Sequence, residues 1–166
     1  SSLKPGAKRE ILQIVDIKEG KKSITPIISP KIGGTFPSFS PDNKKIAFIS
    51  YKNNKFGDIC LLYFKTKIKE IFKYTRKLRR RKGFKKLFFT KCINIPLLKK
   101  AYKFSPSFSP DGKNIIFTAI PIDTNKNQKI DINDNSVLYA YSLKERKLYQ
   151  LTNMGYSSYA AKWRRA

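Results

Sequence analysis

The sequence predicts an all-β fold assembled from repeated four-stranded antiparallel units. The first observation is an internal repeat, because PSFSPD occurs at residues 37–42 and again at 106–111. The second is that a matching apolar stretch follows each copy, at 45–50 and at 114–119. The third is turn chemistry: in SPDN and SPDG the proline presets φ, the aspartate bonds its own backbone, and Asn or Gly accepts a positive φ.

Two complete units are expected, at residues 36–75 and 104–153. Each contains four short stretches in which apolar, β-branched and aromatic residues alternate or run together, as they do in strands. The stretches of the first unit lie around Phe39 and at 45–50, 58–64 and 70–75, and those of the second lie around Phe108 and at 114–119, 136–142 and 147–152. Four antiparallel strands with a turn at each junction describe a β-propeller blade.

Incomplete units flank the two blades. Residues 1–35 match the second half of a blade and a connector, with a KEGK turn between two strands. Residues 154–166 match the start of another blade, in which Trp163 takes the place of Phe39 and Phe108. The chain therefore predicts about two to two and a half blades, whereas closed propellers have about 4–8. We expect part of a larger propeller, whose remaining blades come from the parent chain or from a partner.

The residues around these turns resemble a known family. PSFSPDNKKIAFIS (37–50) and PSFSPDGKNIIFTA (106–119) are similar to the WSPDGxxIxF signature of TolB-like, WD-repeat-like (PD40) propeller repeats. LYAYSLKERKLYQLT (138–152) resembles the closing strands of that family. The likeness covers most of residues 10–163, although both copies have Phe where the family favours Trp. It implies a non-catalytic module that binds proteins or ligands through its loops.

Net charge is the most unusual feature of the composition. Thirty-six Lys and Arg residues against 11 Asp and Glu residues give a formal charge of +25 and a sequence pI near 10.2. Such a charge attracts polyanions: nucleic acid, anionic lipid or an acidic partner. Two explanations stay open, namely compositional drift in a Lys-, Ile-, Asn- and Phe-rich chain with solvated lysines, and a selected polyanion site.

The sequence contains no histidine, which excludes several kinds of site. Ser-His-Asp and Cys-His triads, His-ligated zinc and the commonest general base all require it. The two cysteines, Cys60 and Cys92, lack a CxxC context, and neither is predicted to be a nucleophile. Cys60 lies in an apolar strand pattern and is predicted to be a small core residue, while a disulfide bond with Cys92 stays open as the alternative.

A basic insertion, residues 76–103, separates the two predicted blades. Its basic residues gather at the beginning: Arg76, Lys77, Arg79, Arg80, Arg81, Lys82, Lys85 and Lys86. Phe84, Phe88 and Phe89 lie within or directly after this run. Basic residues interleaved with aromatic ones can hold a phosphate backbone and stack bases, or lie on an anionic membrane surface. The alternative is a solvated loop between blades.

A second insertion, residues 123–134, lies between the second and third strands of the second blade. Its DxNxNxxIDxND spacing is close to the calcium-loop pattern DxDxDGxIxxxE. The predicted Ca²⁺ ligands are the side chains of Asp123, Asn125, Asn127, Asp131 and Asp134 and the carbonyl of Lys129. Gln128 stands in place of the usual Gly, and Asn replaces two of the usual carboxylates. The alternative is a plain Asn- and Asp-rich surface turn.

Three classes of function follow. The first is a non-catalytic propeller for protein or ligand binding, with calcium as a stabilising ion. The second is polyanion binding through residues 76–86. The third is the propeller part of a larger enzyme, since prolyl-oligopeptidase-type peptidases carry similar propellers, and the catalytic residues would then lie outside this chain.

The sequence also bears on location. No stretch approaches the ~18 apolar residues that a membrane helix needs. A calcium loop with few carboxylates would need extracellular or periplasmic calcium concentrations. The expected location is therefore the periplasm, the cell envelope or the outside of the cell, and the cytoplasm stays open.

Overall fold

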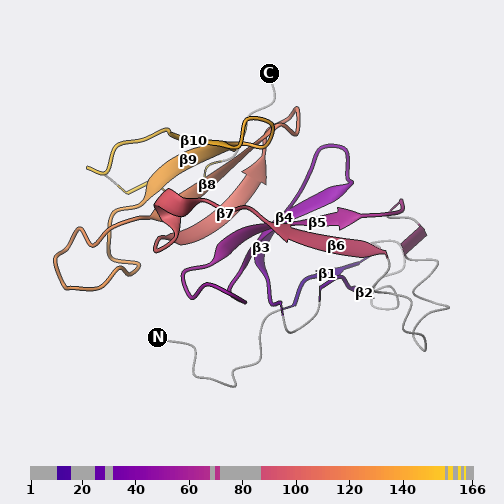
Figure 1. Cartoon of the computed structure of the whole chain (residues 1–166), viewed down its shortest axis with the longest axis horizontal. Helices are drawn as coiled ribbons and strands as arrows, with labels where there is room; N and C mark the ends of the chain where they lie inside the picture. The colour runs from indigo at the N-terminus through magenta and orange to yellow at the C-terminus, as the bar shows by residue number, and fades with distance from the viewer. Residues whose placement is uncertain are drawn as a thin grey trace.

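The computed structural model describes residues 11–15, 25–28, 32–67, 70–71, 87–155, 157–158, 161 and 163. Within these residues the regular structure is two four-stranded antiparallel sheets, a short two-stranded ladder and the 3-10 turn η3 (Pro96–Leu98), with helical geometry at 70–71 (Figure 1). None of the described helical segments has the length and apolar character needed to cross a membrane.

Each four-stranded sheet keeps its strands in chain order. The first blade consists of β3 (Thr35–Phe39), β4 (Lys45–Ser50), β5 (Asp58–Phe64) and β6 (Phe88–Cys92). The second blade consists of β7 (Tyr102–Phe108), β8 (Asn114–Ile120), β9 (Val137–Ser142) and β10 (Lys147–Gln150). The short ladder pairs β1 (Gln13–Ile14) with β2 (Thr25–Pro26). Because neighbouring strands are antiparallel throughout, the prediction of consecutive four-stranded blades is confirmed.

The repeated turns make the same contacts in both blades. The Ser40 hydroxyl donates a hydrogen bond to Asp42 Oδ1 at 2.6 Å, and this bond is the main reason why the pKa of Asp42 lies below its usual value. Ser109 and Asp111 repeat the bond at 2.5 Å. Asn43 adopts a φ of 55°, so Asn supplies the positive φ that Gly supplies in the second copy.

The outermost strand of the first blade differs from the prediction. The sequence predicts this strand at 70–75, but the strand that pairs with β5 is β6, and residues 70–71 are helical. The reason is packing: the two phenylalanines of β6 contact aromatic rings on β5, while Ile71 is buried in an apolar cluster. The first blade therefore extends to residue 92, and the basic residues 76–86 lie between its third and fourth strands rather than between two blades.

Cys60 and Cys92 form a disulfide bond that joins β5 to β6. Cys60 is fully buried, as the core prediction requires, but it is bonded rather than free. The two residues are directly opposite each other in the antiparallel register, which explains how a sequence separation of 32 residues is bridged. The sequence left this bond as an open alternative, because the pairing depends on which segment forms the fourth strand.

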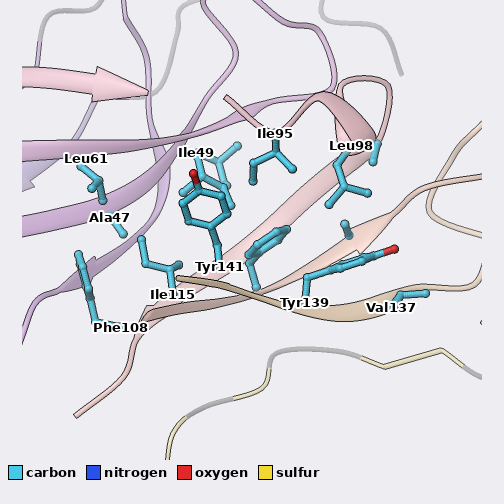
Figure 2. Packing of buried hydrophobic residues seen from close by; sticks show 14 residues of the cluster. Ala47, Ile49, Leu61, Ile95, Leu98, Phe108, Ile115, Val137, Tyr139 and Tyr141 are labelled. Carbon is cyan, nitrogen blue, oxygen red and sulfur yellow. The ribbon is translucent and has the colours of Figure 1, made fainter. Parts of the chain in front are cut away.

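Two clusters of buried apolar side chains hold these elements together. The larger cluster lies between the blades, where β4 and β5 meet β8 and β9, and Ile95 and Leu98 close it near η3 (Figure 2). The smaller cluster packs the β1–β2 ladder on the other face of the first blade. Gly34 permits this close approach, since a Cβ there would lie 2.7 Å from Ile28 Cδ1 and 2.9 Å from Phe48 Cδ2.

A buried polar contact also links the two blades. Lys103 on β7 is only 2% exposed, and its Nζ donates to the carbonyl oxygens of Gly57 at 2.8 Å and Ala101 at 2.9 Å. Burial lowers the pKa of Lys103 to about 8, against a smaller opposing effect of the Asp58 carboxylate. The ammonium is therefore held by backbone oxygens from both blades.

Candidate functional site

The loop at residues 123–134 is held closed by the carboxylate of Asp134, which is fully buried. Its Oδ1 accepts hydrogen bonds from Thr124 N at 2.7 Å and Asn125 N at 3.0 Å, and its Oδ2 accepts from Asp131 N at 2.8 Å. These backbone donors, Asp131 N first among them, lower the pKa of Asp134. Asp134 therefore ties the two ends of the loop together.

The other predicted side-chain ligands form a separate hydrogen-bonded network. Asp123 Oδ1 and Asn125 Oδ1 both accept from Asn127 N, at 3.2 and 3.0 Å. The side-chain amide of Asn127 donates to Asp131 Oδ2 at 3.1 Å. Lys129 follows in the same turn, and its N–H donates to Asn127 Oδ1 at 2.9 Å. The structure thus brings these predicted residues together, and their side chains are more exposed than that of Asp134.

Two non-glycine residues of this loop adopt positive φ. Lys126 has a φ of 60° and Gln128 has a φ of 67°. Gln128 takes the position at which calcium loops usually have Gly, and its N–H donates to Asp123 Oδ2 at 2.7 Å. The sharp turn therefore forms despite the missing Gly, and the hydrogen bond offsets part of the conformational cost.

The donor set fits a weakly charged calcium loop only in part. Asp123, Asn125 and Asp131 supply oxygens of the kind that Ca²⁺ prefers. Both oxygens of Asp134, however, already accept from N–H groups. Among the described residues, no three His, Cys, Asp or Glu side chains are grouped so as to hold a metal ion. A Ca²⁺ ion here would rely on Asp123 and Asp131 together with amide and backbone oxygens.

The predicted polyanion segment, residues 76–86, lies outside the residues that the structure describes. The described residues at its base are close together, because Lys65 N donates to the carbonyl of Leu87 at 2.9 Å. Beside this bond the rings of Tyr63 and Phe89 stack with centroids 4.4 Å apart and an angle of 4°. The Nζ of Lys65 lies 6.0 Å from the centroid of the Phe89 ring. Exposed cationic and aromatic groups therefore meet where the chain leaves the sheet after Lys65 and rejoins it at Leu87.

A row of aromatic rings, which the sequence analysis did not single out, lies along the innermost strands and the loop between β4 and β5. Phe36 on β3 meets Phe104 on β7 edge to face, with ring centroids 6.0 Å apart. Phe104 is stacked with Tyr102 at 6.4 Å, and Tyr102 meets Phe56 edge to face at 5.0 Å. Phe36 is 45% exposed and the other three rings are partly buried. The row crosses from one blade to the next and exists only in the folded chain.

β-Bulges in the inner strands help to orient this row. The register of β3 against β4 shifts between Thr35 and Ser38, and that of β7 against β8 shifts at the equivalent place. The residue before the proline has a positive φ in both, 53° at Phe36 and 47° at Ser105. Bulges redirect side chains. The matching FP and SP pairs are the only sequence signal of this feature, and they do not reveal the contact between blades.

An open depression lies at one end of the aromatic row. Its volume is about 640 Å³, and it is lined by Ile11, Leu12, Gly34, Thr35, Phe36 and Pro37. Phe36 belongs both to the depression and to the row, so the two features adjoin at the inner edge of the first blade.

Two solved structures that are similar to this chain are TolB proteins. The chain is similar to TolB from Acinetobacter baumannii, with a TM-score of 0.53 and 25% sequence identity over 89% of this chain and 28% of that one. It is also similar in fold to the TolB candidate from Agrobacterium tumefaciens, with a TM-score of 0.53 and 13% identity over 84% of this chain and 40% of that one. The sequence matches no protein-family model and no curated protein. The predicted TolB-like β-propeller architecture is confirmed, and the chain spans less than half the length of either structure.

Proposed function

We propose, from the TolB-like propeller fold of its two described blades, that the chain is part of a non-catalytic β-propeller that binds a protein or another ligand. The observation that carries the proposal is the aromatic row of Phe36, Phe104, Tyr102 and Phe56. Aromatic rings that pack against one another offer a partner a large contact area at a small cost in conformational entropy. Since the TolB structures are longer than this chain, the proposal concerns the complete propeller.

The titratable groups support binding rather than catalysis. The sequence has no histidine, and a buried lysine is the only described group that combines deep burial with a strongly lowered pKa. That lysine, Lys103, is enclosed, and two carbonyl oxygens hold its ammonium. A catalytic base must reach the proton that it removes, so Lys103 suits a structural role.

The disulfide bond supports a location outside the cytoplasm. Disulfide bonds persist in oxidising compartments such as the periplasm and the extracellular space, and they are rare in the cytosol. Because Cys60 and Cys92 are joined in this chain, we propose that the protein works in the periplasm, in the cell envelope or outside the cell.

The aromatic row can be tested by capturing a partner. The wild-type chain, Phe36→Ala and Tyr149→Ala would each be immobilised and exposed to an envelope extract of the source organism, and retained proteins would be identified by mass spectrometry. Tyr149 is a matched control, since it is 41% exposed but lies on the outer strand β10. We expect a partner that the wild type and Tyr149→Ala retain and Phe36→Ala loses. If all three chains retain the same proteins equally, the aromatic row is not the binding surface.

We also propose that the loop at residues 123–134 binds Ca²⁺ weakly and that the ion stabilises the second blade. Melting temperatures would be compared in millimolar calcium and in chelator. A ligand that binds only the folded state raises the melting temperature, so we expect an increase for the wild type and none for Asp123→Ala. Asp111→Asn is the control, because Asp111 holds a turn outside the loop and its replacement leaves the calcium effect intact. If the melting temperature of the wild type is the same with calcium and with chelator, the proposal that this loop binds Ca²⁺ is wrong.

A second candidate function, polyanion binding through residues 76–86, is favoured by how unevenly the charge is distributed. Residues 65–92 contain 13 basic residues and one acidic residue, a net charge of +12 in 28 residues, whereas the other 138 residues carry +13. Compositional drift alone predicts an even distribution. A concentrated cationic segment is what binding to a polyanion requires.

Retention on heparin tests this second candidate. We expect neutralising Arg79, Arg80 and Arg81 with Gln to lower the salt concentration of elution more than neutralising Lys144, Arg146 and Lys147 does. The second triple variant removes the same charge from the turn and edge of the second blade. Equal shifts in the two variants would mean that net charge, rather than this segment, holds the polyanion.

A further inference from the structure

The outer end of the first blade carries aromatic and cationic side chains on one face. Tyr63 is directly opposite Phe89 in the β5–β6 pairing, and Leu61 is opposite Lys91. Because side chains alternate along a strand, Phe89 and Lys91 lie on the same face as Tyr63. Phe89 is 48% exposed, and the lysines on either side of it, Lys65 and Lys91, are exposed as well. We call Tyr63, Lys65, Phe89 and Lys91 the rim.

The rim lies at the base of the most basic part of the chain. Lys65 N is bonded to Leu87 O, so the segment between these residues both begins and ends there. The only acidic residue between positions 65 and 92 is Glu70, and it accepts a hydrogen bond from the Thr66 hydroxyl. Along the chain, the rim is therefore flanked by many basic residues and by a single carboxylate.

The mixture of side chains favours one polyanion over another. Leu78 and Leu87 accompany the phenylalanines within and beside the basic segment, and leucine cannot stack on a nucleobase. One face of the Phe89 ring is already covered by Tyr63. A surface that lies in a bilayer interface needs basic groups for the headgroup phosphates and aliphatic or aromatic groups for the acyl boundary. Both kinds are present at the rim.

We infer that the rim docks on the surface of a bilayer containing anionic phospholipid, with Lys65 and Lys91 against headgroup phosphates and Phe89 in the interface. This inference rests on the polyanion-binding function proposed above and names its ligand. The outer end of the first blade would then contact the membrane, and the inner aromatic row would stay accessible to a partner.

Vesicle sedimentation tests the inference. The chain would be mixed with phosphatidylcholine vesicles that contain or lack phosphatidylglycerol. We expect the wild type to bind only the anionic vesicles. Lys65→Gln and Lys91→Gln should each weaken partitioning about fivefold, and Phe89→Ala about tenfold. Phe89→Leu keeps an apolar side chain and should retain most of the binding.

The control is the equivalent place in the second blade. Lys147 Nζ lies 5.3 Å from the centroid of the exposed Tyr149 ring on β10, but the basic segment is not adjacent in sequence. Lys147→Gln and Tyr149→Ala should leave vesicle binding unchanged. Circular dichroism of every variant separates a loss of binding from a loss of fold.

Three results would overturn the inference. The first is that the wild-type chain does not sediment with anionic vesicles. The second is that the rim variants bind anionic vesicles as well as the wild type does. The third is binding of a single-stranded oligonucleotide through Phe89 without binding of vesicles. If the arginine triple variant alters heparin retention while the chain never binds vesicles, the proposal of polyanion binding stands and the inference of membrane docking is wrong. If the chain binds neither heparin nor vesicles, both proposals are wrong.

Discussion

Asp134 illustrates at the scale of a single residue how one sequence position can serve two purposes. In the calcium-loop pattern it is the closing ligand, whereas in the structure its carboxylate accepts backbone hydrogen bonds from both ends of the loop. Four other backbone N–H groups of the loop donate to Asp or Asn side-chain oxygens. Hydrogen bonds among the loop's own residues therefore contribute to its shape.

We predict that Asp134→Asn lowers the melting temperature by a few degrees even in chelator. The amide can accept on one atom only, which leaves buried N–H groups unpaired. Asp123→Asn serves as a comparison at the same loop and should cost less, because Asp123 is more exposed. Melting curves by circular dichroism would measure both, and equal melting temperatures for wild type and Asp134→Asn would contradict this role.

Lys103 gives a prediction with a defined pH window. Its pKa is about 8 in the folded chain, below the ordinary value of 10.5, so the unfolded chain binds more protons between these pH values. Stability contributed by this group therefore rises as pH increases from about 8 to 10.5, by roughly 3 kcal/mol at most. Below pH 8 the cost of the buried charge is fully present.

Chemical denaturation of wild type and Lys103→Met across this pH range checks the prediction. Methionine cannot titrate, so the difference in unfolding free energy between the two chains should change with pH only between about 8 and 10.5. A difference that stays constant across the range would mean that Lys103 keeps its ordinary pKa.

At the scale of elements, the two blades hold their outermost strands by different means. β9 and β10 are joined by only four residues, 143–146, so their pairing is local. β5 and β6 are separated by 23 residues, 65–87, and closing a longer loop costs more entropy. The disulfide between Cys60 and Cys92 offsets that cost, because it keeps the same two strands together in the unfolded chain.

We predict that the double variant Cys60→Ala, Cys92→Ser lowers the unfolding free energy by about 3 to 4 kcal/mol. Hydrogen exchange should show the loss first in β6, whereas β10 keeps its protection. A reduced wild-type chain provides an independent check, since it removes the bond without changing the core. Uniform loss of protection across both blades would show that the disulfide stabilises the whole chain rather than one strand.

Gly34 tests the packing of the β1–β2 ladder on the first blade. A methyl group there would overlap the side chains of Ile28 and Phe48, so we expect Gly34→Ala to cost about 1–3 kcal/mol. Gly155→Ala is the matched control, since a Cβ at that glycine meets nothing within 4 Å. Urea denaturation would compare the stabilities of the two variants. Equal midpoints would mean that the β1–β2 ladder shifts to accommodate the methyl group without loss of stability.

The strands that sequence analysis located correctly are those with a local signal. β4, β5, β8 and β9 each carry a strong apolar run, and the SPDN and SPDG turns fix where the second strands begin. The sequence analysis missed β6 because residues 70–75 have an equally good strand pattern and lie closer to β5 along the chain. Only tertiary contacts with β5, including the disulfide, decide between the two segments.

For the whole molecule, the charge of +25 opposes compaction. Self-repulsion is screened by salt, with a Debye length of about 10 Å at 0.1 M. We predict that the melting temperature rises with sodium chloride, and that the rise is smaller when Arg79, Arg80 and Arg81 are changed to Gln. A melting temperature that is the same at low and moderate salt would mean that the charges are too far apart to repel.

The candidate site was only partly accessible to sequence analysis at this scale. The residues of the 123–134 loop are contiguous, and their pattern predicted that they would lie together. The aromatic row joins Phe36 and Phe56 of one blade to Tyr102 and Phe104 of the next, so its members meet only when the blades pack. No pattern within a single repeat contains that information.

The bond between Lys65 N and Leu87 O has a practical consequence for engineering. The chain leaves the sheet and returns to it at adjacent points, and the disulfide at the other end of the β5–β6 pairing holds the same two strands together. A folded domain with closely spaced termini should therefore be insertable within residues 76–86 without altering either blade, provided that Ile71, which is buried in the apolar cluster of the first blade, is retained. The outer edge of the first blade would become an attachment point for a reporter or a second binding domain.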